Sequence, residues 1–353
     1  MNFLSDNVHG LDDTILKAMA GQASGTASSY GEDKLTGKVE ARFRDIFECD
    51  LRVFAVTTGT AANALSLSLY TPPFGTVFCH EQAHIMVDEC GAPEMFCGGA
   101  KLIGLDGEGG KIDAVALGQA ADGLKHHVPH QGIGACVSLS QSTEMGQVYE
   151  PDEIAAIAAA AHERGMGVHM DGARFANALV ALGCSPAAVT WRAGVDVLSF
   201  GATKNGAALA EAIVLFDVAR ADELMYRRKR AGQLVSKGRF LAAQFDAYLE
   251  NDHWLELARH ANAMAARLCE GLLKLEGVEL AAPVQANEVF VRLPPALHAR
   301  LVNGGARYYD WPGGKRDDKR ILARLVCSFA TTAEDIAACL ALASAPALKT
   351  PKA

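Results

Sequence analysis

Apolar residues recur along this chain at two spacings, one typical of helices and one typical of strands. Val39, Phe43 and Phe47 are four residues apart, which predicts an amphipathic helix over residues 38–48. A run rich in β-branched and aromatic residues at 52–57 predicts a strand, and an alanine-rich helical segment follows it. Because helical and strand-like segments keep alternating up to about residue 218, we expect a mostly parallel sheet covered by helices.

Further strands of this sheet are expected at short runs of apolar or β-branched residues. These runs lie at 76–79, 134–139, 166–170, 195–199 and 212–216. Helices are expected between them, most clearly over residues 151–164. There Pro151 stands at the first helical position, and Asp152 and Glu153 lie in the first turn.

The pattern changes after about residue 218 and predicts a second unit. The expected elements are a charged helix over 219–233, two long helices over 244–275 broken near Asn251-Asp252, strands at 277–280, 288–293 and 322–329, a helix near Ala296 and a helix from Thr332. This mixture is typical of a small α+β domain. We therefore predict an N-terminal arm (1–14), a large domain (15–250), a small C-terminal domain (251–345) and a flexible tail (346–353).

Composition and charge agree with two globular domains and narrow the choice of partners. Of 353 residues, 50% are hydrophobic and 21% charged, and 33 basic against 41 acidic residues give a net charge of −8. No basic face is evident, so we expect no nucleic-acid partner. No apolar run approaches the roughly 20 residues of a membrane span, and the first residues do not resemble a signal peptide. A cytoplasmic protein without membrane contact is the expectation.

Neither the cysteines nor the histidines form a pattern typical of metal ligands. The nine cysteines lie apart in mostly apolar surroundings, without a Cys-x-x-Cys pair, so reduced thiols are expected. Three histidines fall within residues 126–130, around Pro129 and without an accompanying carboxylate. That pattern favours a solvated loop over a metal site, and we expect no bound metal.

Two segments that follow predicted strands carry residues suited to amine chemistry. Lys204 lies among small residues in 201–206, at the end of an apolar strand, where a buried amine can form a Schiff base. Asp171 follows the preceding strand, and the carboxyl ends of strands in an α/β sheet meet at one ligand-binding edge. An ordinary loop lysine and a helix-capping aspartate are the alternatives. A lysine and a carboxylate facing one cavity are what pyridoxal phosphate (PLP) requires.

A third strand end offers an anion-binding turn. Residues 58–61 read Thr-Gly-Thr-Ala and join the strand at 52–57 to the next helix. Backbone N–H groups at a helix start, together with a hydroxyl, suit a phosphate group. Such turns are common, so this one identifies PLP only in combination with Lys204 and Asp171.

Several motifs occur in an order that identifies a resemblance to a known family. They are Ser5-Asp6-Asn7, Tyr30-Gly31-Glu32-Asp33, Thr58 to Asn63, Ala83-His84 with Asp88 to Glu94, His169 to Arg174, and Thr203 to Gly206. Over roughly residues 3–330 the chain resembles the PLP-dependent threonine aldolases, closest to the low-specificity L-threonine or L-phenylserine branch. The resemblance implies PLP fold type I, the aspartate-aminotransferase-like fold of the β-eliminating lyases, with a large mostly parallel sheet domain and a small α+β domain.

The resemblance also implies a role for each matching residue. Lys204 would hold PLP as an internal aldimine, Asp171 would pair with the pyridinium nitrogen, and His84 would stack on the ring. The phosphate would be bound by Gly59, Thr60 and Thr203, with Arg228 as a helper. Arg174 would contact the phenolic oxygen side of the cofactor and the substrate, while Ser5 and Arg324 would hold the substrate carboxylate. Tyr30 would reach the site of a neighbouring subunit, which implies a homodimer or a dimer-of-dimers tetramer.

The implied activity is the reversible cleavage of L-threonine, L-allo-threonine or a related amino acid such as phenylserine to glycine and an aldehyde. A β-eliminating lyase of another kind, or an aminotransferase, would keep Lys204 and Asp171 and is the alternative. One departure concerns the base that removes the hydroxyl proton. Many relatives have a histidine after the strand at 134–139, where this chain has Glu144. His84 is the first candidate for this base, and Glu144 acting through water is the second.

Overall fold

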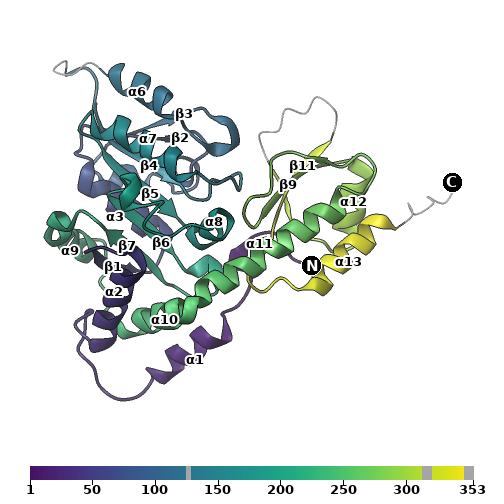
Figure 1. Cartoon of the computed structure of the whole chain (residues 1–353), viewed down its shortest axis with the longest axis horizontal. Helices are drawn as coiled ribbons and strands as arrows, with labels where there is room; N and C mark the ends of the chain where they lie inside the picture. Colours follow the sequence, from purple (N-terminus) through teal and green to yellow (C-terminus); the bar gives the residue numbers. More distant parts are fainter. Residues whose placement is uncertain (125–128, 312–319, 346–353) are drawn as a thin grey trace.

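Two β-sheets form two lobes of the molecule, and a long helix joins them (Figure 1). The computed structural model describes residues 1–124, 129–311 and 320–345. Residues 126–128 of the histidine segment and the predicted tail at 346–353 therefore lie outside the described residues.

The large lobe is built on a seven-stranded sheet with the order β1-β7-β6-β5-β4-β2-β3. Its strands are β1 (Arg52–Val56), β2 (Gly75–His80), β3 (Lys101–Leu105), β4 (Ile133–Ser140), β5 (Gly167–Gly172), β6 (Val197–Gly201) and β7 (Glu211–Leu215). Within this sheet β7 runs against the other strands, since it pairs antiparallel with both β1 and β6. The remaining neighbours pair in parallel. The predicted mostly parallel sheet is confirmed.

The strand ends differ from the predicted ones in a way that matters for the site. Strands β5 and β6 each continue two residues beyond their predicted ends at 170 and 199. Asp171 is therefore part of β5 and does not follow it. The edge strand β3 was not predicted, because its partly exposed residues lack a clear alternation.

Helices pack against the large sheet, and several of them connect consecutive strands along the chain. They are α1 (Asp13–Gly21), α2 (Lys34–Phe47), α3 (Gly59–Tyr70), α4 (His84–Val87), α5 (Ala92–Phe96), α6 (Ala114–Asp122), α7 (Pro151–His162), α8 (Phe175–Leu182), α9 (Ala221–Arg230) and α10 (Arg239–Leu249). Short 3-10 turns are η1 (Asp6–Val8), η2 (Glu108–Gly110), η3 (Trp191–Ala193), η4 (Thr203–Asn205), η5 (Val218–Arg220) and η6 (Glu250–Asp252). Phe200 on β6 lies at the centre of the core, with ring centroids 5.1 Å from Phe43 and 5.5 Å from Trp254.

The small lobe has a four-stranded antiparallel sheet with the order β10-β11-β9-β8. Its elements are β8 (Glu279–Leu280), β9 (Glu288–Leu293), α12 (Pro295–Asn303), β10 (Tyr309–Asp310), β11 (Ile321–Val326) and α13 (Ala333–Ser344). The predicted strand at 322–329 thus ends three residues early, and β10 was not predicted.

Helix α11 (His253–Leu272) belongs to both lobes. Trp254 and Ala258 pack in the core of the large lobe, whereas Ala265 and Leu268 pack in the core of the small lobe. The predicted break before this helix is present, because Asn251 and Asp252 have φ angles of 51° and 58°.

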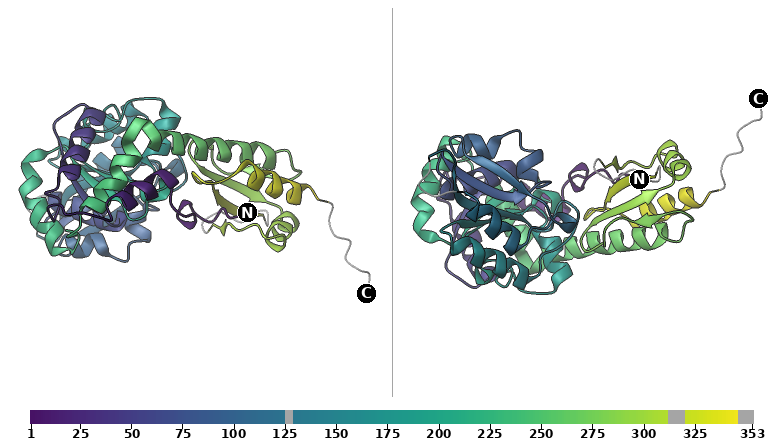
Figure 2. Two further views of the ribbon diagram at one scale, coloured as in Figure 1. Left: turned by 90° about the horizontal axis from the view of Figure 1, so that it is seen from below. Right: turned by 90° about the horizontal axis from the view of Figure 1, so that it is seen from above.

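The N-terminal arm crosses from the small lobe to the large lobe (Figure 2). Asn2 forms a β-bridge with Arg307, and Phe3 is fully buried in the core of the small lobe. Helix α1 then packs against α10 of the large lobe. Between these two contacts, η1 of the arm lies close to η4, the turn that follows β6.

Three further expectations concern metal, thiols and membranes. All nine cysteines are free, and Cys90 is the exposed one among them. Across residues 1–124, 129–311 and 320–345, no group of three or more His, Cys, Asp or Glu side chains is arranged to hold a metal ion. The helices of these same ranges include none with the length and apolar character needed to cross a bilayer.

Candidate active site

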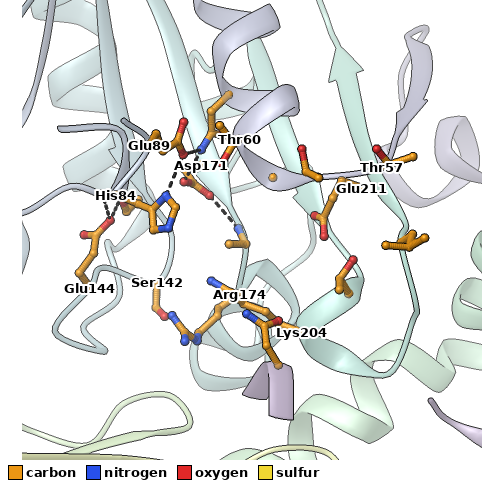
Figure 3. A pocket seen from close by; sticks show the side chains of 18 residues that line it. Thr57, Thr60, His84, Glu89, Ser142, Glu144, Asp171, Arg174, Lys204 and Glu211 are labelled. Atoms are coloured by element: carbon orange, nitrogen blue, oxygen red, sulfur yellow. Dashed lines mark hydrogen bonds and ion pairs between the residues drawn. The ribbon is translucent and has the colours of Figure 1, made fainter. Parts of the chain in front are cut away.

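A cavity of about 390 Å³ opens at the carboxyl ends of the parallel strands of the large sheet. Eight of the residues predicted as site residues line it together: Gly59, Thr60, His84, Glu144, Asp171, Arg174, Thr203 and Lys204. They converge from the segments after β1, β2, β4 and β6 and from the end of β5 (Figure 3). The rule that strand ends form the ligand crevice of an α/β sheet accounts for this meeting of distant segments.

Lys204 lies in η4, directly after β6. The neighbouring Asn205 fixes this turn, because its Nδ2 atom donates to Tyr248 Oη and to the Trp254 carbonyl at 2.8 Å each. Within the described parts of the chain, the Lys204 Nζ atom makes no hydrogen bond or ion pair. The backbone of the turn is therefore held while the amine stays available to a ligand.

Asp171 is buried at the floor of the cavity, with 7% of its surface exposed. Its Oδ1 atom accepts a hydrogen bond from the Ala173 N–H at 3.0 Å, and its Oδ2 atom accepts one from Asn63 Nδ2 at 2.8 Å. These two donors fix the orientation of the carboxylate. Each of its oxygen atoms keeps further lone pairs for a ligand.

The turn from β1 into α3 forms an anion-binding end of the cavity. Thr58 caps α3, since its hydroxyl accepts from the Ala61 N–H at 3.1 Å. The N–H groups of Gly59 and Thr60 stand in the first turn, where no intrahelical acceptor exists. A Cβ atom built on Gly59 meets no atom within 4 Å, so open space lies beside these donors. Thr203 lines the same cavity from η4.

His84 lies at the opposite side of the cavity, in a chain of hydrogen bonds with acidic residues (Figure 3). Its Nδ1 atom is 2.8 Å from Glu89 Oε1, which also accepts from Asn63 Nδ2 at 2.8 Å. The hydrogen bond with Glu89 raises the pKa of His84. The Nε2 atom has no hydrogen-bond partner in the described ranges, so it is the ring nitrogen that a ligand can meet.

Glu144 supports the backbone of His84. Its Oε1 atom accepts from the His84 N–H at 2.9 Å and from Ser140 Oγ at 2.7 Å. Its Oε2 atom is buried without a hydrogen-bond partner. Burial raises the pKa of Glu144.

Arg174 joins the cavity to a buried group of charges. Its guanidinium binds Asp6 from the arm at 2.8 Å and 3.1 Å, and its Nη1 atom lies 3.4 Å from Glu288 on β9. Burial alone would lower the pKa of Arg174, but Asp6 and Glu288 raise it, so the side chain stays cationic. Burial raises the pKa of Glu288, against the opposing effect of Arg174 and Arg324.

Two predicted substrate ligands border this group of charges but do not line the cavity. Ser5 caps η1, where its hydroxyl accepts from the Asn7 N–H at 3.2 Å. The Arg324 guanidinium lies over Trp311 at 4.4 Å and 4.0 Å from Glu288. Ser5 thus lies next to Asp6, and Arg324 lies next to Glu288; these two carboxylates contact Arg174. The predicted role of Ser5 and Arg324 in holding the substrate carboxylate stays a prediction.

Tyr30 and Arg228 lie elsewhere within the chain. They line a second cavity of about 530 Å³ between α2, β1, α9 and α10. The Arg228 Nε atom donates to the Gln233 carbonyl at 3.3 Å, and burial lowers the pKa of Arg228 to about 10. Within one chain, neither residue reaches the cavity of Lys204.

Five residues that contribute to the site were assigned no role from the sequence. Asn63 and Glu89 belong to motifs that carry the family resemblance. For Asn63 a further signal was available, since it is a polar residue on an otherwise apolar helix face. Glu211 and Glu288 are carboxylates at the start of apolar strands, which is also an unusual pattern. Asp6 belongs to the motif Ser5-Asp6-Asn7, but its role had no local signal, because its partners are 168 and 281 residues away.

The residues of the cavity fit PLP. An available lysine amine, a fixed buried carboxylate and an anion-binding turn are the three features that hold its aldehyde, ring nitrogen and phosphate. The open space beside Gly59 meets the need for close approach of a phosphate to the backbone.

Comparisons with known proteins agree with this interpretation. Residues 2–294 match the family described as Beta-eliminating lyase. The chain is 44% identical to a Pseudomonas protein named low specificity L-threonine aldolase, over 93% of each chain. A solved structure of Leishmania major threonine aldolase has a TM-score of 0.90 at 28% identity and covers 97% of this chain and 98% of that one.

A Sphingomonas wittichii serine palmitoyltransferase, at 15% identity with a TM-score of 0.73, covers 97% of this chain and 86% of its own and shares the fold alone. The fold is therefore PLP fold type I, as expected. Because the family match spans most of the chain and the Pseudomonas relative aligns over nearly its whole length, this protein belongs to the beta-eliminating lyase family of PLP-dependent enzymes.

Proposed function

We propose that this protein is a PLP-dependent aldehyde-lyase that cleaves L-threonine and related L-β-hydroxy-α-amino acids to glycine and an aldehyde. The observation that carries the proposal is the meeting of Lys204, Asp171 and the turn at 58–61 in one cavity. The 44% identity to a low specificity L-threonine aldolase supports the choice of reaction. The same relatives support a small amino acid as the substrate.

In this proposal the Lys204 amine would hold the cofactor through its aldehyde group. When bound, PLP would supply a ring that can accept electrons from Cα of the substrate. The Asp171 carboxylate would place a negative charge beside the ring nitrogen, which favours the protonated ring. Asn63 and the Ala173 N–H hold that carboxylate in place.

The bond cleavage begins with removal of the proton from the substrate hydroxyl. His84 Nε2 is the atom proposed to take it, since Nδ1 is occupied by Glu89. Glu144 is the second candidate, acting through water from its unpartnered Oε2 atom. Arg174 and Arg324, with Ser5, are proposed to hold the substrate carboxylate, because a guanidinium suits a carboxylate through two parallel hydrogen bonds.

We further propose a homo-oligomer in the cytoplasm. The support for self-association is the position of Tyr30 and Arg228, two predicted ligands that face a second cavity of the same chain. In a dimer, that cavity would lie at the neighbour's site. Sedimentation of the purified protein measures the oligomeric state, and cell fractionation measures the location.

Lys204→Ala tests the proposed function. The unaltered protein, supplied with PLP and L-threonine, is expected to yield glycine and acetaldehyde in equal amounts. Lys204→Ala is expected to lose this activity together with the visible absorbance band and the borohydride-reducible adduct of PLP. Lys274→Ala, at an exposed lysine outside the cavity, is the matched control and should keep all three.

Two results would contradict the proposal. A reducible adduct that persists in Lys204→Ala would show that another amine binds PLP. A keto acid or ammonia as the main product would instead identify an aminotransferase or another kind of β-eliminating lyase.

A further inference from the structure

Glu211 is a buried carboxylate in the cavity that neither the motifs nor the proposed reaction uses. It is the first residue of β7, where it pairs with Val56 of β1 on one side and Gly201 of β6 on the other. Both partners lie just before the segments that form the anion-binding end, namely residues 57–60 and 203–204. Glu211 therefore lies between the two segments expected to hold the phosphate, as Figure 3 shows for Thr57 and Glu211.

The side chain is directed into this end of the cavity. It is 7% exposed and lines the cavity together with Thr58, Gly59 and Thr60. Thr203 lies beside it, with its hydroxyl accepting from the Ala210 N–H at 3.3 Å and donating to the Ala210 carbonyl at 3.4 Å. The charged or titratable groups that face it are Lys204 on η4, Asp171 on β5 and, more remotely, Tyr248 on α10.

An ionised Glu211 would conflict with a bound phosphate. A phosphate monoester carries a charge of about −1.5 to −2 near neutral pH, and two buried anions side by side repel strongly. The cationic side chains that line the cavity in the described chain are those of Lys204 and Arg174, with His84 when protonated. In the proposed function the Lys204 nitrogen is bonded to the cofactor aldehyde and is not free to pair with the phosphate, and Arg174 is engaged by Asp6.

We propose that Glu211 binds the phosphate of the cofactor as a neutral carboxylic acid and donates a hydrogen bond to a phosphate oxygen. The proposal rests on the proposed function only in requiring PLP at this cavity. A protonated carboxyl group converts a repulsive neighbour into a donor, alongside the N–H groups of Gly59 and Thr60 and the Thr203 hydroxyl.

The environment of Glu211 makes the carboxyl group easier to protonate before any ligand binds. Burial raises the pKa of Glu211 to about 7, although Thr203 and Lys204 act in the opposite direction. An anion placed beside it raises the pKa further. Binding of PLP above pH 7 should therefore be accompanied by uptake of a proton by Glu211.

Proton uptake by the unaltered protein is the first measurement. Calorimetric titration of the cofactor-free protein in buffers of different ionisation enthalpy gives the number of protons bound. At pH 8, binding of PLP is expected to be accompanied by the uptake of close to one more proton per site than binding of pyridoxal. Pyridoxal lacks the phosphate but reacts with the same lysine. Equal proton uptake for the two ligands would overturn the proposal.

Variants then assign the proton to Glu211. Glu211→Gln keeps a donor, so the extra proton uptake should disappear while PLP still binds. Glu144→Gln, at another buried carboxyl group of the same cavity with a raised pKa, is the matched control and should keep the uptake. An uptake that persists in Glu211→Gln would assign the proton to the phosphate itself and overturn the proposal.

Affinity provides an independent readout. For the unaltered protein, the Kd of PLP should rise about tenfold per pH unit above the pKa of Glu211, relative to Glu211→Gln. Glu211→Ala removes the donor and should weaken PLP binding about tenfold or more at pH 6.5. If both variants bind PLP more tightly than the unaltered protein, Glu211 is an ionised, repulsive neighbour and the proposal is wrong.

The two proposals fail in different ways. Absence of any adduct between PLP and the unaltered protein would contradict the proposed function, and with it the premise for Glu211. Formation of the adduct and of glycine, with no difference in proton uptake between PLP and pyridoxal, would contradict the role of Glu211 alone.

Discussion

His84 and Glu144 lie beside each other, and in the described ranges each has one polar side-chain atom without a hydrogen-bond partner, but only that of Glu144 is buried. The His84 ring keeps Nε2 available, and Glu89 orients it through Nδ1. Glu144 uses Oε1 for two hydrogen bonds, one of them to the His84 backbone, and its Oε2 is buried. This geometry favours His84 as the base and Glu144 as a residue that positions it.

Two substitutions distinguish these roles. His84→Ala is expected to lower kcat for threonine cleavage at least about a hundredfold, the contribution typical of general-base catalysis. Glu144→Gln keeps an oxygen that can accept from the His84 N–H, so a loss of less than about tenfold is expected. Steady-state kinetics of both variants provides the measurement, and if neither slows the reaction, both candidates are wrong.

The pH dependence of the reaction should depend on Glu89. Its hydrogen bond raises the pKa of His84, and a base must be neutral to accept a proton. Glu89→Gln removes the negative charge, so the pKa of His84 falls and the acid limb of the kcat profile moves to lower pH. Asp88→Gln, at the exposed neighbouring carboxylate, should leave the limb in place. An unchanged limb in Glu89→Gln would show that His84 is not the group that titrates.

The roles of single residues could be predicted from the sequence where these residues lie at or just after the end of a predicted strand. Lys204, Asp171 and Gly59 could be predicted because the ends of parallel strands meet at one edge. Asp6 and Glu288 could not, because they reach Arg174 from the arm and from the small lobe. Contacts between segments that far apart depend on how the lobes pack, which no local pattern records.

At the scale of single elements, most helices and strands were found but several ends were not. Helix α2 begins at Lys34, four residues before the predicted start at 38, because Asp33 caps it. The apolar spacing of Val39, Phe43 and Phe47 marks only the buried face. A first turn that packs against little is defined by its cap, and a cap leaves a weaker signal in the sequence than a core face.

Asp33→Ala tests the importance of that cap. The Asp33 carboxylate accepts from the Thr36 N–H and hydroxyl at 2.9 Å each. Its loss is expected to destabilise the protein by about 1 kcal/mol, the usual effect of removing an N-cap. Asp45→Ala, at an exposed site in the same helix, should change stability by less than about 0.5 kcal/mol. Urea unfolding of both variants measures the difference, and equal midpoints would contradict the role of the cap.

At the scale of the whole molecule, we propose the division into domains near residue 250 that the sequence predicted. The break at Asn251 and Asp252 separates α10 from α11, and the two lobes have separate hydrophobic cores. The first turns of α11 nevertheless pack in the large lobe. A cooperative unit that ends within α11 is therefore expected, which limited proteolysis can locate.

Asp6 connects the three parts of the chain. It belongs to the arm and binds Arg174 of the large lobe at 2.8 Å and Asn287 of the small lobe at 3.1 Å. Burial alone would raise its pKa, but Arg174 lowers the pKa of Asp6 below the ordinary value of 3.8. The ion pair thus stabilises the fold above that pH, and the contribution is lost as the pH falls through the lower folded-state pKa.

Asp6→Asn should therefore destabilise the protein in a pH-dependent way. Removing one partner of a buried ion pair costs about 3 kcal/mol or more, because the other charge stays buried. At pH 7 the difference in unfolding free energy from the unaltered protein should have this size, and it should shrink below pH 3.8. Asp13→Asn, at an exposed carboxylate of α1, is the control. A difference that is constant with pH would mean that the ion pair is not its source.

The continuity of α11 has a mechanical consequence. A helix of 20 residues is about 30 Å long, and this one has its first turns fixed in one core and its last turns in the other. Because the helix is continuous, the small lobe cannot turn relative to the large lobe without bending the helix or disturbing one of the two cores. The helix thereby fixes the positions of Glu288 and Arg324 on the small sheet relative to Arg174.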